Sequence, residues 1–214
     1  ISKPHLSWIV PQQFFDRYDL DSFEAPQIKL DDLEDITKAN GDPIHQPKAD
    51  YQWVAANGLE KEAARAYLAA VSYADHCLGL IFDALANSEQ ADNTIVVLWG
   101  DHGYHLGEKL RYQKNTLWRE AARTPLIVRL PEMSGQQDST RPVSLIDLYP
   151  TLVELCGLPK KTLDGSDISP LLQDPSMEWT KPGVTVAQYG TSVLTENWHY
   201  IHNLRGNEEL YHLK

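Results

Sequence analysis

The sequence predicts an α/β fold, because a long amphipathic helix precedes two short apolar strands. From Glu60 to Leu85, apolar residues recur at three- and four-residue spacing, the pattern of a helix that buries one face. Residues 94–99 form a continuous run rich in β-branched side chains, which is typical of a strand buried on both faces. Residues 125–130 repeat that pattern. A helix followed by buried strands indicates an α/β fold.

Shorter elements are expected around this framework. Residues 1–20 predict an extended segment that ends in an aromatic turn, and residues 30–38 and 117–122 predict one short helix each. Ser144, followed by Asp147 three residues later, predicts the capped start of a helix over 145–155.

The last forty residues have a different character. Short alternating stretches at 184–189, 192–195 and 199–203 predict a small antiparallel sheet, with turns at Asn197 and Gly206. A boundary between two domains is expected near 172–182. The chain would then comprise an α/β domain over 1–175 and a small, incomplete subdomain over 176–214.

Composition narrows the functional classes. With 214 residues, 42% of them hydrophobic, the chain can bury a core. Its formal net charge of -11 repels phosphate backbones, so nucleic acid is not expected as a partner. We find no apolar run of about 18 residues and expect no membrane span. The first residue is Ile1, so a processed or truncated chain is expected.

The main chemical signal is Gly100-Asp101-His102-Gly103, directly after the strand predicted at 94–99. Ligands in open α/β sheets gather at the carboxyl ends of strands. Carboxylate and imidazole groups both bind metal ions, and flanking glycines let the backbone turn sharply. The alternative is a structural turn in which Asp101 caps the next element.

Three further residues are candidates for substrate contacts. Lys114, thirteen residues after Asp101, places a cation where it can bind an oxyanion, although a single loop lysine is more often a solvated charge. His5 lies in a proline-flanked extended segment and can equally serve in packing. His105 can donate to a substrate or lie on the loop surface.

Several segments resemble the type I sulfatases of the alkaline phosphatase-like superfamily, with the iduronate-2-sulfatase-like branch nearest. The resemblance is carried by residues 97–109, 114–118 and 123–128, with further agreement at 3–6, Pro11, 144–152 and 209–211. It implies a sandwich of a mixed sheet between helices, followed by a small antiparallel C-terminal sheet.

The resemblance also implies an activity and a site. Asp101 and His102 would ligate a single calcium ion, and Lys114 and His5 would contact the sulfate group as catalytic residues, with His105 as a further substrate contact. The reaction would be hydrolysis of sulfate esters, with a sulfated carbohydrate such as a glycosaminoglycan as substrate. A periplasmic, secreted or lysosomal location would follow.

One departure from the family pattern matters. The family nucleophile is a formylglycine made in a Cys/Ser-x-Pro/Ala-x-Arg motif, but Cys77 and Cys156 both lie in other contexts. The N-terminal Asp-Asp pair that supplies further calcium ligands is also missing. We therefore expect the chain to be the C-terminal part of a sulfatase, completed by an N-terminal half or companion chain, and inactive by itself.

Two other readings stay open. A two-zinc phosphodiesterase or phosphatase of the same superfamily would need more ligands, and Asp42 with His45 is the only upstream pair available. A non-catalytic domain that binds anionic sugars would use aromatic side chains such as Trp8, Tyr104 and Trp118 for stacking.

Overall fold

The computed structural model describes residues 1–131, 133–204 and 206–213. Its contacts divide the chain into two compact units. Unit 1 contains Ile1–Asp35, His45–Lys114 and Pro125–Glu132, and unit 2 contains Ile36–Ile44, Asn115–Thr124 and Met133–Lys214. The units alternate along the sequence, so this division differs from the boundary expected near 172–182.

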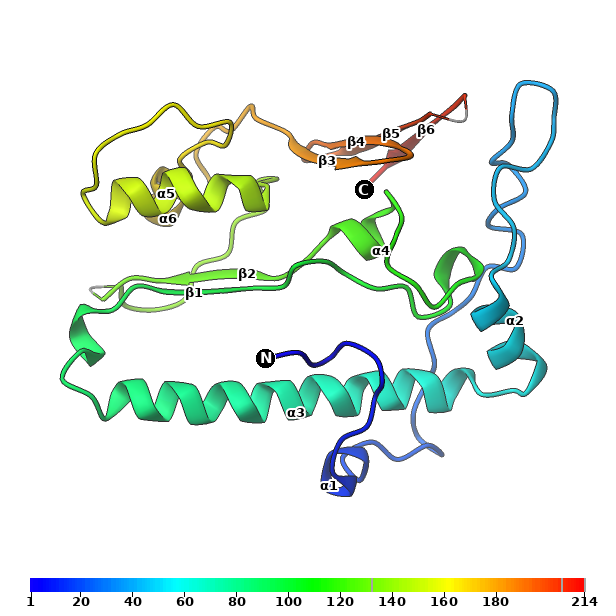
Figure 1. The fold of residues 1–214 in the computed structure, drawn as a ribbon, viewed down its shortest axis with the longest axis horizontal. Helices are drawn as coiled ribbons and strands as arrows, with labels where there is room; N and C mark the ends of the chain where they lie inside the picture. The colour runs from blue at the N-terminus through cyan, green and yellow to red at the C-terminus, as the bar shows by residue number, and fades with distance from the viewer. Residues whose placement is uncertain (132, 205, 214) are drawn as a thin grey trace. The chain divides into compact units, whose positions relative to one another are not determined.

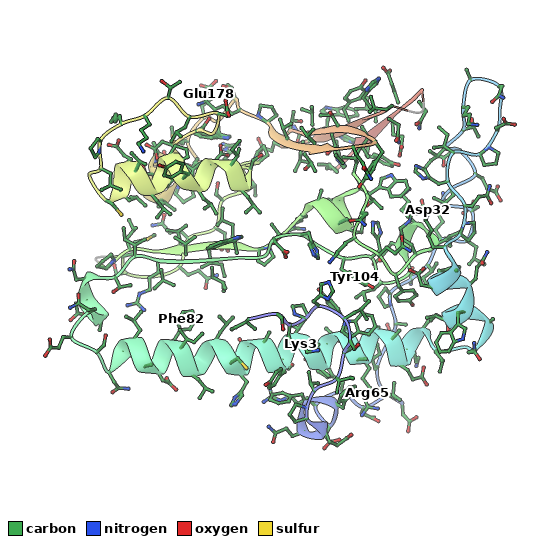
Figure 2. The ribbon with its side chains drawn as sticks, in the orientation of Figure 1. Lys3, Asp32, Arg65, Phe82, Tyr104 and Glu178 are labelled. Carbon is green, nitrogen blue, oxygen red and sulfur yellow. The ribbon has the colours of Figure 1, made fainter. Side chains whose placement is uncertain are left out.

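Unit 1 is organised along one long helix (Figure 1). Helix α3 is confirmed where the apolar periodicity predicts it. The expected aromatic turn is the short helix α1, in which Phe14 is 1% exposed and packs edge-on against Tyr73 of α3. Figure 2 shows Arg65 of α3 beside α1, where its guanidinium donates to the Phe15 carbonyl oxygen at 3.1 Å. The helices of unit 1 are α1 (Gln12–Phe15), α2 (Ala49–Ala56), α3 (Glu60–Ala86), η1 (Ala91–Asn93) and η2 (Glu108–Leu110).

The two predicted strands form an antiparallel pair. Strand β1 (Val96–Trp99) pairs with β2 (Leu126–Arg129), with Trp99 opposite Leu126. The expectation of burial on both faces is wrong for this chain, since β1 is only partly covered and Trp99 is 50% exposed. The reason is that β2 is the only neighbour that the described residues give β1.

The prediction of a helix at 30–38 is wrong, because most of this segment forms turns. Its hydrogen bonds join residues three apart, such as Asp32 N to Lys29 O at 3.3 Å and Glu34 N to Asp31 O at 3.0 Å. Four acidic side chains at positions 31, 32, 34 and 35 would repel one another on a helix surface. Charge repulsion therefore outweighs the weak apolar pattern.

Helix α3 is the one helix among the described residues that is long and apolar enough to cross a membrane. It has 27 residues, and its most apolar window has a mean hydropathy of 1.3. Core helices of globular proteins pass the same test of length and composition, so this is weak evidence for a span. The absence of a membrane partner stays a prediction.

Unit 2 combines short helices with a four-stranded antiparallel sheet (Figure 1). The capped start predicted at Ser144 is confirmed, because Ser144 and Asp147 form a reciprocal capping box. The predicted C-terminal sheet is confirmed too, with the order β3-β4-β5-β6. Strand β6 extends it beyond the predicted strands. The elements are α4 (Arg119–Ala122), η3 (Leu145–Asp147), α5 (Leu148–Leu155), α6 (Ser169–Gln173), β3 (Gly183–Ala187), β4 (Gly190–Leu194), β5 (Trp198–Asn203) and β6 (Asn207–His212).

Candidate active site

The end of β1 delivers the Asp-His pair to an open position in unit 1. The backbone N–H of Gly100 donates to the Pro125 carbonyl oxygen at 3.2 Å, which holds the turn against the segment before β2. The Asp101 side chain is 84% exposed, and its Oδ1 accepts from the His102 backbone N–H at 3.1 Å. The second carboxylate oxygen therefore faces solvent with capacity for a ligand.

The backbone sets the tautomer of His102. Its Nδ1 lies 2.7 Å from the Gly103 carbonyl oxygen, which can only accept a hydrogen bond, so Nδ1 carries the hydrogen in the neutral ring. The lone pair then lies on Nε2, which is 3.6 Å from Asp101 Oδ2. A carboxylate oxygen and an imidazole lone pair are thus adjacent, as two ligands of one metal ion would be.

His5 and Lys114, 109 residues apart in sequence, meet in the structure. His5 Nδ1 lies 2.7 Å from the Leu6 carbonyl oxygen, so by the same argument Nε2 is an acceptor. Lys114 Nζ donates to that Nε2 at 2.6 Å. The His5 and His102 rings lie edge to face with centroids 6.4 Å apart. The structure therefore brings four of the five predicted site residues together, namely Asp101, His102, His5 and Lys114.

A hairpin-like loop places Lys114 near the Asp-His pair. Residues at its base bond across it: the His105 N–H donates to Gln113 O at 3.0 Å, and the Tyr104 hydroxyl donates to Tyr112 O at 2.5 Å. Burial raises the pKa of Tyr104 to about 12, so its hydroxyl keeps the proton that it donates. The two ends of the loop, at His102 and Lys114, are consequently held close together.

The tip of the loop is anchored by an ion pair. Gly107 has φ 114°, and Lys109 and Leu110 both have positive φ near 50°, a conformation that costs about 1–3 kcal/mol for a residue with a side chain. Lys109 Nζ donates to Asp32 Oδ1 at 2.9 Å, with only 11% of the lysine side chain exposed. Asp32 lies beside this loop in Figure 2. The ion pair joins this part of the loop to the turn that contains Asp32.

His105 does not join the candidate site. It is completely buried at the base of the loop, which excludes the loop-surface alternative and leaves no ring atom facing solvent. Burial, assisted by the nearby Arg111 guanidinium, lowers the pKa of His105 to about 3. The structure thus gives its predicted substrate contact no support.

Sequence reasoning missed an aromatic cluster that connects the His5 segment to the loop. The Trp8 ring contacts the rings of Tyr67 and Tyr104, each at 5.9 Å between centroids. The Trp8 indole N–H donates to the Pro4 carbonyl oxygen at 3.0 Å, one residue before His5. Trp8 follows the candidate residue His5 by three positions, and this proximity was the one signal in the sequence that the tryptophan could help to position the His5 segment. Trp8 is half-buried and packs against these two tyrosine rings within unit 1, and the sugar-stacking alternative stays a prediction.

The described residues do not complete a metal site. They contain no cluster of three or more His, Cys, Asp or Glu side chains arranged to hold an ion. Calcium takes six to eight oxygen ligands, so Asp101 and His102 supply only part of a set and calcium does not fit this chain alone. The described residues also contain no cluster that could hold a zinc ion. Asp42 and His45, the candidate ligand pair for the two-zinc alternative, belong to different units.

Comparison with known proteins identifies the family. The model of the Sulfatase family matches residues 2–158, well over half of the chain. A sulfatase of Formosa agariphila is 37% identical over 98% of this chain and 42% of its own length. An N-acetylglucosamine-6-O-sulfatase of Bacteroides thetaiotaomicron is 30% identical over 55% of this chain and 22% of its own. The chain belongs to the sulfatase family.

Solved structures agree on the fold. A phosphonate monoester hydrolase from Silicibacter pomeroyi superposes with TM-score 0.77 at 18% identity, covering 98% of this chain and 48% of that one. A putative sulfatase from Bacteroides fragilis gives 0.73 at 21% identity, covering 98% and 45%. The predicted alkaline phosphatase-like α/β fold with a small antiparallel C-terminal sheet is confirmed. The chain spans less than half the length of these relatives.

Proposed function

We propose that this chain is part of a sulfatase that hydrolyses sulfate esters, with a sulfated carbohydrate as substrate. The observation that carries the proposal is the 2.6 Å contact between Lys114 Nζ and His5 Nε2, beside the Asp101–His102 pair. Family membership supports the reaction. The N-acetylglucosamine-6-O-sulfatase among the relatives supports the choice of a carbohydrate.

Lys114 and His5 would act as a unit on the sulfate group. An ammonium group has three N–H donors, and Lys114 uses one of them on His5. The other two are available for sulfate oxygens, on which negative charge grows as the ester bond breaks. His5 thereby orients the ammonium, and this arrangement needs a neutral imidazole, since a protonated ring has no lone pair to accept from Lys114.

The remaining chemistry would come from polypeptide outside this chain. We propose that Asp101 and His102 contribute two ligands to a single calcium ion, whose bound charge would neutralise part of the charge of the sulfate. The nucleophile would be a formylglycine in the same missing part. The isolated chain should then bind calcium weakly and show no turnover, and sulfatase activity in the isolated chain would contradict this.

Apolar surfaces of unit 1 support the need for a further half of the protein. Helix α3 exposes Leu80 and Ile81, and the paired strands expose Trp99 and Ile127. Exposed apolar side chains on neighbouring elements offer a surface on which another polypeptide could pack. We propose that an N-terminal half or companion chain covers them.

Mass spectrometry tests that proposal on the protein purified from its source. Intact-mass analysis with peptide mapping should find a co-purifying N-terminal polypeptide and a residue converted to formylglycine. Finding only these 214 residues, with no such modification, would contradict it.

Substitution of Lys114 tests the site on the intact protein. Removing one donor from a charge-stabilising site costs about 100- to 1,000-fold in rate, so Lys114→Ala should lower kcat/KM for a sulfated monosaccharide by that factor. Lys29→Ala is the matched control, because Lys29 is an exposed lysine of the same unit and should leave the rate unchanged. Full activity in Lys114→Ala would refute the assignment.

A second candidate is a phosphodiesterase-type activity. The observation that favours it is the structural similarity to phosphonate monoester hydrolases, which at 18% and 21% identity concerns the fold alone. Metal analysis of the intact protein separates the two, since one calcium ion favours the sulfatase and two zinc ions the alternative. A purely sugar-binding role predicts binding of sulfated sugars without turnover. The iduronate-2-sulfatase-like branch and a periplasmic, secreted or lysosomal location stay predictions.

A further inference from the structure

The N-terminal segment of unit 1 that carries His5 has little backbone support from other elements. Within the described residues, the backbone hydrogen bonds of residues 1–10 stay inside the segment, such as Ile9 N–H to Ser7 O at 2.8 Å. His5, Leu6 and Ile9 are all exposed. Side-chain contacts must therefore hold His5 at the place where it meets Lys114.

Both polar groups of the peptide that enters His5 are hydrogen bonded. The His5 backbone N–H donates to Ser2 O at 3.1 Å. The Pro4 carbonyl oxygen, in the same planar peptide unit, accepts from the Trp8 indole N–H at 3.0 Å. The plane of this peptide sets the direction in which the His5 side chain projects. The indole N–H thus helps to fix the line along which His5 Nε2 reaches Lys114.

The Trp8 ring packs against two tyrosine rings from other parts of unit 1. It meets the Tyr67 ring at 79° and the Tyr104 ring at 78°, in each case with centroids 5.9 Å apart. The two tyrosine rings are nearly parallel to each other, with 14° between their planes. Edge-to-face contacts favour a defined ring orientation. Because Tyr67 belongs to the long helix α3, the cluster joins the N-terminal segment to a regular element.

Tyr104 connects the same cluster to Lys114. In Figure 2 it lies beside the N-terminal segment. Its hydroxyl donates to the carbonyl oxygen of Tyr112, two residues before Lys114. Trp8 therefore contacts both sides of the pair, since its N–H bonds the segment of His5 and its ring packs on the loop that carries Lys114. A change at Trp8 should displace one partner relative to the other.

We propose that Trp8 is a positioning residue of the sulfate-contacting site, because its indole sets the place of His5 Nε2 against Lys114 Nζ. Trp8 acts through His5 and not on the substrate. A displacement of about 1 Å can cost about 100-fold in rate, so the loss of one hydrogen bond that fixes His5 should cost about tenfold. The proposal deepens the proposed function and rests on it.

Kinetics of the intact protein test the proposal with Trp8→Phe, which keeps an aromatic ring and removes the N–H. This change should lower kcat/KM for a sulfated monosaccharide about tenfold in the wild-type background but less than about twofold in His5→Ala, because Trp8 acts through His5. A merely structural role would lower the rate equally in both backgrounds. Trp53→Phe is the matched control, since Trp53 is 62% exposed in α2 and its substitution should leave kcat/KM unchanged.

Nitrogen NMR of the intact protein reports the contact without turnover. An imidazole nitrogen that accepts a hydrogen bond resonates at a different frequency from a free one. Lys114→Ala supplies the signal of free His5 Nε2, and His5→Ala identifies that signal by its loss. Trp8→Phe should move the signal at least half of the way to the free position, whereas Trp53→Phe should leave it in place. If Trp8→Phe does not fold, Tyr67→Leu, which removes a ring partner and keeps the indole, should move the signal in the same direction.

The outcomes separate this proposal from the proposed function. A wild-type rate or an unshifted His5 signal in Trp8→Phe would overturn the positioning role, and so would a rate loss that persists in full in His5→Ala. Full activity in Lys114→Ala refutes the assignment of the sulfate-contacting site instead. In that case the His5 signal still decides whether Trp8 positions the pair.

Discussion

The buried His105 makes the stability of the fold depend on pH. The unfolded chain has the ordinary histidine pKa of 6.5, whereas burial lowers the folded pKa of His105 to about 3. Between these two values the unfolded chain binds a proton that the folded chain excludes. The free energy of unfolding must therefore fall as the pH falls through this window. Above the window the His105 ring is neutral in both states, so it does not lower the stability of the fold.

The size of the effect follows from the two pKa values. Between pH 7 and pH 5, the proton that only the unfolded chain binds changes the unfolding equilibrium constant by about 1.4 powers of ten. This change lowers the free energy of unfolding by about 2 kcal/mol through His105. His199 is also buried, and its lowered pKa adds a loss of the same sign. Two kcal/mol is a large share of the stability of a typical domain.

Urea unfolding of wild type and His105→Gln at both pH values measures this contribution. The substitution removes the titrating ring, so the variant should lose about 2 kcal/mol less than wild type between pH 7 and pH 5. An NMR titration of the His105 ring should show no protonation above pH 5. Parallel pH dependences in the two proteins, or protonation near pH 6.5, would refute the burial argument.

Two further predictions concern the free energy of unfolding, measured by urea denaturation. Asp32→Ala removes a carboxylate partner of the nearly buried Lys109 ammonium and should lower the free energy of unfolding by about 2 kcal/mol. Asp31→Ala, which removes one member of an exposed ion pair, should lower it by less than about 0.5 kcal/mol. Equal losses would contradict the role of burial. Gly165→Ala would place a Cβ 2.1 Å from the Ile146 carbonyl oxygen and should lower the free energy of unfolding by at least about 2 kcal/mol. Gly79→Ala, in α3, would place a Cβ in open space and should raise the free energy of unfolding by about 0.5–1 kcal/mol. A tolerated Gly165→Ala would show that this backbone contact can relax.

The sequence was most informative where a pattern is local. The periodicity of α3 and the capping box at Ser144 depend on residues three or four apart, and both are confirmed. The alternation in the last forty residues likewise predicts a sheet whose strands pair in sequence order. Each of these signals is complete within a short window of the chain.

The failures have a different physical origin. Burial of β1 depends on neighbouring strands, and the described residues provide only β2, so Trp99 is exposed despite its apolar surroundings in sequence. The contact between His5 and Lys114 is not a failure, because the family resemblance placed both residues at one group, but it joins residues 109 apart and their spacing alone does not predict it. His105 looks like a loop histidine in sequence, and only the packing of the folded loop buries it.

The alternation of the two units along the sequence limits how this protein can be divided. The chain passes between the units after residues 35, 44, 114, 124 and 132, so each unit is assembled from segments that lie on both sides of the other. No single proteolytic cut or gene truncation can release either unit whole. Modular exchange of one unit between proteins would require several simultaneous breakpoints, and the two units are therefore expected to be inherited together.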